Sequence, residues 1–94
     1  MTNDISTISI IVTGRVQGVW FRASTKNEAD RLGLIGFVKN MPNAGVYIEV
    51  TGGPLELDAF TEWCGKGPEL ARVELVEVNE ISQTQFQGFE VRRS

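Results

Sequence analysis

The chain has 94 residues and a net charge of −3, and its 41% hydrophobic and 22% charged residues are typical of one globular domain with a modest core. The negative charge argues against general nucleic-acid binding, because domains that bind nucleic acids are usually basic. The lack of histidine excludes a histidine-based catalytic triad and, with Cys64 as the single cysteine, argues against a zinc site.

Apolar–polar alternation identifies the strands, and apolar residues at helical spacing identify the helices. The predicted elements, in chain order, are a strand over Ile8–Thr13, a helix over Phe21–Leu32, strands over Leu34–Asn40 and Val46–Thr51, a helix over Pro54–Cys64, a strand over Arg72–Asn79 and a short strand over Gln85–Val91. The apolar phase slips between Leu75 and Val76, which predicts a β-bulge there. In the last strand we expect Phe89 and Val91 to point inward.

The order of these elements predicts the fold. Strand, helix, strand, strand, helix and strand, followed by a short extra C-terminal strand, is the split βαβ arrangement of a ferredoxin-like α+β sandwich. Both helices would cover one face of a mostly antiparallel sheet. We expect residues 1–94 to form a single domain of this kind.

The segment GRVQGVWFR, residues 14–22, joins the first strand to the first helix and has features of an anion site. Gly14 and Gly18 permit backbone angles closed to other residues, and positions 14–23 contain no Ser, Thr, Asp or Asn that would cap the helix. Free N–H groups at the start of a helix favour the binding of an anion. The positively charged guanidinium of Arg22 can donate two parallel hydrogen bonds to the same anion. The alternative is a plain turn, because neither a Walker loop nor GxGxxG is present.

A second polar residue is expected near this segment. In a split βαβ fold the first two strands are parallel and flank the third, so their carboxyl ends lie at one sheet edge, about 10 Å apart. Asn40 ends the second strand and could bind a water molecule beside an anion in the loop. Its alternative role is to open the turn that follows.

The remaining candidate residues have structural explanations. We expect Cys64 and Trp63 to pack in the core. Tyr47 lies where an RNA-binding module would place an aromatic residue that stacks on a base, but the neighbouring Glu49 is negative, so we do not expect RNA binding. Arg92 and Arg93 are expected to form a solvated tail whose end could approach the loop.

A lone cysteine fits a reducing compartment, and the N-terminal residues resemble neither a signal peptide nor a membrane span. We therefore expect a cytoplasmic protein without membrane partners. We also expect a monomer.

GRVQGVWFR followed by LGLIGFVKN resembles the acylphosphatase signature, and VYIEVTG, FTEWCGKGP and GFEVR extend the resemblance along nearly the whole chain. It implies a small ferredoxin-like enzyme that hydrolyses the carboxyl–phosphate bond of acyl phosphates without a metal or other cofactor. It also implies that Arg22 binds the phosphate and that Asn40 positions the attacking water. The backbone amides that cradle the phosphate would belong to Arg15, Val16, Gln17, Gly18, Val19, Trp20 and Phe21.

Two positions depart from the family pattern. Trp20 stands where smaller or variable residues are usual, and it would narrow the entrance to the site. Met41 follows Asn40 where some members carry threonine, so a hydroxyl is missing there. We expect these departures to affect rate and substrate range, and to leave the reaction itself unchanged.

The hydrolysis of an acyl phosphate can proceed in a site that has few acidic or basic side chains. The conjugate acid of a carboxylate leaving group has a pKa of about 4, so the group departs unprotonated and needs no general acid. Inorganic phosphate or sulfate is expected to compete with the substrate. The alternatives are a non-catalytic module of the same fold that binds a phosphate or carbamoyl-type ligand, which would not need Asn40, and a plain interaction domain.

Overall fold

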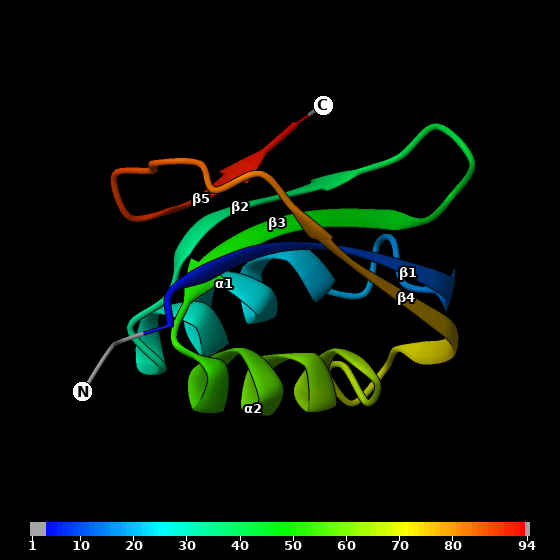
Figure 1. Cartoon of the computed structure of the whole chain (residues 1–94). Helices are drawn as coiled ribbons and strands as arrows, with labels where there is room; N and C mark the ends of the chain where they lie inside the picture. The colour runs from blue at the N-terminus through cyan, green and yellow to red at the C-terminus, as the bar shows by residue number, and fades with distance from the viewer. Residues whose placement is uncertain (1–3, 94) are drawn as a thin grey trace.

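The computed structural model describes residues 4–93, and within this range five strands form one sheet in the order β4-β1-β3-β2-β5. Both helices cover the same face of the sheet and lie side by side beneath it (Figure 1). The elements are β1 (Ser6–Arg15), α1 (Phe21–Arg31), β2 (Ile35–Asn40), β3 (Val46–Gly52), α2 (Pro54–Cys64), β4 (Arg72–Ile81) and β5 (Phe89–Arg92). The predicted ferredoxin-like α+β fold is confirmed.

The strand pairing places the ends of β1 and β2 at the same edge of the sheet. The central strand β3 pairs antiparallel with both of them, so β1 and β2 run parallel to each other. Val46 on β3 lies opposite Val12 on one side and opposite Asn40 on the other. Two strand spacings, about 10 Å, therefore separate β1 from Asn40 at this level of the sheet.

The hydrophobic core lies between the sheet and the two helices. Its buried residues come from the inward faces of β1, β2 and β3, from both helices and from the start of β5. They include Ile10, Val12, Val38, Val46, Ile48 and Val50 from the sheet and Phe21, Ala29, Leu57, Phe60 and Cys64 from the helices. Cys64 is thus a packing residue, as the sequence predicts, and the half-buried Trp63 ring lies 5.6 Å from that of Phe21.

The β-bulge lies one residue earlier than predicted. Thr13 pairs with Leu75 and Gly14 with Val73, so Glu74 is the extra residue of β4. Gly14 has φ 128°, and a Cβ atom there would collide with the carbonyl oxygen of Arg72. The apolar phase misplaces the bulge because β4 is an exposed edge strand, on which no buried face fixes the alternation.

The last strand departs most from its prediction. β5 begins at Phe89 and pairs in parallel with β2. Phe89 is buried as expected, but Val91 is 43% exposed, so its predicted inward position is wrong. The reason is that β5 is an edge strand, with a neighbouring strand on one side only, so alternation along it does not guarantee burial. The other element boundaries differ from their predictions by two residues or fewer.

Candidate active site

The turn from β1 into α1 leaves a series of backbone N–H groups without protein partners. Gly18 and Trp20 both have left-handed backbone angles, with φ 74° and 65°, and Trp20 is the N-cap of α1 without a side-chain cap. The first helical hydrogen bond runs from Ser24 N to Trp20 O at 3.0 Å. Among residues 4–93, no acceptor takes a hydrogen bond from the N–H groups of residues 16–23. The sequence-based expectation of an uncapped helix start is met.

The Gln17 side chain holds this turn against the β2–β3 hairpin. Its Nε2 donates one hydrogen bond to the carbonyl oxygen of Met41 and another to that of Gly45, both at 2.8 Å. Because Met41 directly follows Asn40, Gln17 fixes the distance between the turn and the end of β2. Sequence reasoning gave Gln17 only a backbone role and missed this connection.

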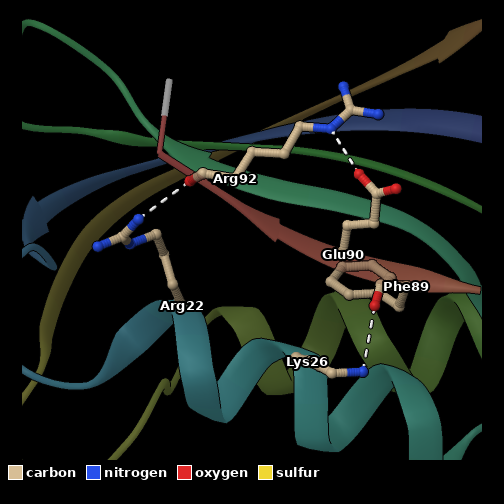
Figure 2. Close-up of polar contacts among 5 residues, drawn as sticks. All are labelled: Arg22, Lys26, Phe89, Glu90 and Arg92. Atoms are coloured by element: carbon tan, nitrogen blue, oxygen red, sulfur yellow. Dashed lines mark hydrogen bonds and ion pairs between the residues drawn. The ribbon is translucent and has the colours of Figure 1, made fainter.

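Arg22 lies in the first turn of α1 and reaches the end of β5. Its Nη1 donates a hydrogen bond to the carbonyl oxygen of Arg92 at 3.0 Å (Figure 2). One helical turn later, Lys26 Nζ donates to the carbonyl oxygen of Phe89 at 3.1 Å. Two points on β5 are therefore attached to α1, and the first of them orients the Arg22 guanidinium.

Arg92 is exposed, as expected, but it belongs to the strand β5, so its expected place in a tail is wrong. Its Nε donates to Glu90 Oε1 at 2.9 Å, and its guanidinium lies 3.9 Å from the centre of the Phe37 ring on the open face of the sheet. Arg93 follows the strand and is exposed. The expected approach of the chain's end to the loop takes place through the Arg92 carbonyl group.

Asn40 is the last residue of β2, and its side-chain oxygen is buried beside the turn. Within the described part of the chain, Asn40 Oδ1 has no hydrogen-bond donor. A buried polar atom without a partner costs free energy, so such atoms are rare in native structures. Arg22 and Asn40 line the same cavity, so the two predicted residues do lie close together.

This cavity has a volume of about 350 Å³ and brings together six of the nine predicted site residues. They are Val16, Gly18, Trp20, Phe21, Arg22 and Asn40. The other three lie around it: Arg15 pairs with Arg72 at the end of β1, Gln17 binds the hairpin, and Val19 packs against the core. Ala23 and Val91 also line the cavity, and sequence reasoning assigned neither to the site.

Arg22 is the one charged side chain among the described residues that line the cavity, and no carboxylate or thiol lines it. Across residues 4–93, His, Cys, Asp and Glu side chains form no group of three that could bind a metal ion together. Neither described helix has the length and apolar character needed to cross a membrane. The polar groups of the residues that line the cavity are therefore main-chain groups, one guanidinium and one side-chain amide.

Two titratable groups elsewhere are held in their neutral form. Burial, reinforced by the nearby charge of Glu28, raises the pKa of the Cys64 thiol to about 12, so it is no nucleophile at neutral pH. Burial also raises the pKa of Tyr47 to about 12, assisted by a 2.6 Å hydrogen bond from its hydroxyl to Glu49. Neither residue lines the cavity described above.

The chain is similar to known proteins over nearly its whole length. The acylphosphatase family model matches residues 8–91. An acylphosphatase of Marinobacter nauticus is 49% identical over 76 residues, covering 81% of this chain and 83% of that protein. An acylphosphatase of Methylococcus capsulatus is 44% identical over 87 residues, covering 92% and 95% of the two chains. The solved structure of an acylphosphatase from Coxiella burnetii matches with a TM-score of 0.92 at 37% identity, covering 96% of this chain and 94% of that one. The chain therefore belongs to the acylphosphatase family of enzymes.

Proposed function

We propose that the chain hydrolyses the carboxyl–phosphate bond of acyl phosphates to a carboxylate and inorganic phosphate, without a metal ion. The observation that carries the proposal is the buried, unpartnered Asn40 Oδ1 in the same cavity as Arg22 and the uncapped start of α1. A site for binding phosphate alone would need the cation and the amides, but it would not need a buried acceptor. The acceptor supports a site that also holds a water molecule.

The phosphoryl group would bind at the start of α1. The unpaired N–H groups of residues 16–23 and the helix dipole favour a dianion there, and Arg22 supplies charge-assisted hydrogen bonds. The Arg92 carbonyl accepts from one Arg22 nitrogen and leaves the other donors of the guanidinium for phosphate. Donors fixed in this way stabilise charge in the transition state without reorganising.

The attacking water would donate a hydrogen bond to Asn40 Oδ1. Its oxygen forms a new bond to phosphorus as the bond from phosphorus to the acyl oxygen breaks, and the bonding electrons leave with the carboxylate. A loose transition state demands little nucleophilic strength, and the leaving group needs no proton. Because an amide is no general base, the water's proton passes to a phosphoryl oxygen or to solvent.

Hydrolysis of benzoyl phosphate by the purified protein in excess EDTA tests this function. We expect turnover under these conditions, with inorganic phosphate or sulfate as competitive inhibitors. We expect Asn40→Ala to lower kcat about 100-fold, because a misplaced reactant costs about that factor, and to leave the inhibition constant of phosphate unchanged. Asn79→Ala, on the exposed edge strand β4, is the matched control and should behave as wild type.

The outcomes separate the candidate functions. Wild-type turnover with equally fast Asn40→Ala would show that Asn40 does not position the water. Phosphate binding by a wild-type protein that leaves benzoyl phosphate intact would instead favour the non-catalytic ligand-binding module. No hydrolysis and no anion binding would remove the proposal altogether.

A further inference from the structure

The position of Asn40 restricts where the acyl group of the substrate can lie. This argument rests on the proposed function, in which water attacks the phosphorus in line with the leaving oxygen. The water is held at Asn40 Oδ1, which is buried, so the leaving group must point away from the floor of the cavity. The cavity floor contains the buried Val16 and Phe21, and its exposed rim contains Trp20 and Val91.

We propose that Trp20 and Val91 form the subsite for the acyl group and make the enzyme selective for apolar acyl phosphates, aromatic ones above all. Trp20 is 76% exposed and Val91 43% exposed, and both line the cavity. With Arg22 committed to the phosphoryl group and Asn40 to the water, the rest of the cavity lining is apolar or glycine. An acyl group with a second charge would therefore lose water there and find no partner.

Trp20 lacks a structural reason for its size. Its φ of 65° is a strained conformation for a bulky residue, whereas glycine would adopt it freely. Trp63, by contrast, packs against the rings of Phe21 and Phe60. Among the described residues, Trp20 makes no such aromatic contact, and three quarters of its surface is exposed. Backbone strain held at the mouth of a ligand cavity is typical of a functional position.

The ratio of kcat/KM for benzoyl phosphate to that for acetyl phosphate tests the subsite. We expect Trp20→Gly to lower this ratio about tenfold, the size of an aromatic pair interaction, and Trp20→Phe to restore most of it. We expect Val91→Thr to lower it about threefold, as for the loss of one buried methyl group. Val78→Thr is the matched control, because Val78 is 44% exposed on β4, outside this cavity, and should leave the ratio unchanged.

Binding of phosphonates provides a second measurement that needs no turnover. Phenylphosphonate and methylphosphonate are titrated against the tryptophan fluorescence of a Trp63→Phe background, in which Trp20 is the reporter. We expect phenylphosphonate to bind several-fold more tightly than methylphosphonate and to change the emission of Trp20. Far-UV circular dichroism and Tm show whether each variant is folded.

Failure of the subsite is distinguishable from failure of the proposed function. If both acyl phosphates are hydrolysed and Trp20→Gly keeps the wild-type ratio, the acyl subsite is wrong and the hydrolysis stands. The subsite is also wrong if the two phosphonates bind equally well to the wild-type protein. If neither acyl phosphate is hydrolysed, the proposed function fails, and the phosphonate titration alone decides whether Trp20 contacts an organic group.

Discussion

Two turns, residues 16–20 and residues 41–45, lie at the same edge of the sheet. They differ in whether their main-chain N–H groups have acceptors within the protein. In the β2–β3 hairpin, residues 41–45, main-chain donors find acceptors inside the turn: Met41 N donates to Gly45 O at 2.8 Å, and Gly45 N donates to Asn43 Oδ1 at 3.1 Å. The turn at residues 16–20 leaves its donors unpaired within the described part of the chain. The comparison shows which of the two turns has main-chain donors available for the ligand we propose, while the hairpin contacts that turn through the hydrogen bonds from Gln17.

Removing the link between the two turns is the strongest way to break this arrangement. Gln17→Leu deletes both hydrogen bonds to the hairpin carbonyls while keeping a similar volume. We expect kcat for benzoyl phosphate to fall about tenfold, because Asn40 and the turn would no longer be held in register. Loss of two hydrogen bonds should also lower the free energy of unfolding by about 1–3 kcal/mol, measured by urea denaturation.

Asn27→Leu is the control for the Gln17 variant, because Asn27 is an exposed residue of α1. It places a leucine on the surface without touching either turn, and we expect wild-type kcat. Wild-type kcat in Gln17→Leu as well would show that the hairpin is not needed to place Asn40.

A change inside the hairpin should have a smaller effect, and on stability alone. Ala44 has φ 75°, a left-handed conformation that glycine adopts without strain. We expect Ala44→Gly to raise the free energy of unfolding by about 0.5–1 kcal/mol, since relief of strain exceeds the added entropy of the unfolded chain. Urea denaturation measures the change, and kcat should stay at the wild-type value. A fall in kcat would mean that the hairpin takes part in the site directly.

Much of this architecture can be predicted from the sequence, because alternation and helical spacing directly reflect which face of an element is buried. Topology alone also places Asn40 near the first turn, since parallel strands that flank a common neighbour end at one edge. The sequence does not reveal the partners of Gln17 or of Arg22. They are backbone carbonyl groups, and every residue has one, so no residue type marks them.

Val91 shows a second limit. Alternation with Phe89 correctly assigns both residues to one face of β5, but it does not show whether anything covers that face. At Phe89 the α2 residue Phe60 packs against the ring at 6.2 Å, whereas Val91 lies at the mouth of the cavity. An apolar residue that alternation assigns to the core can therefore line an open cavity when its strand lies at the edge of the sheet.

The most direct test of the central claim is an NMR titration of the uniformly ¹⁵N-labelled protein with inorganic phosphate. The account predicts that the amide signals of residues 16–23 shift together along one saturating curve, while the internally bonded amides of Met41 and Gly45 shift much less. It would be contradicted if phosphate bound and the largest shifts lay outside residues 16–23, or if these amides did not respond at saturating phosphate.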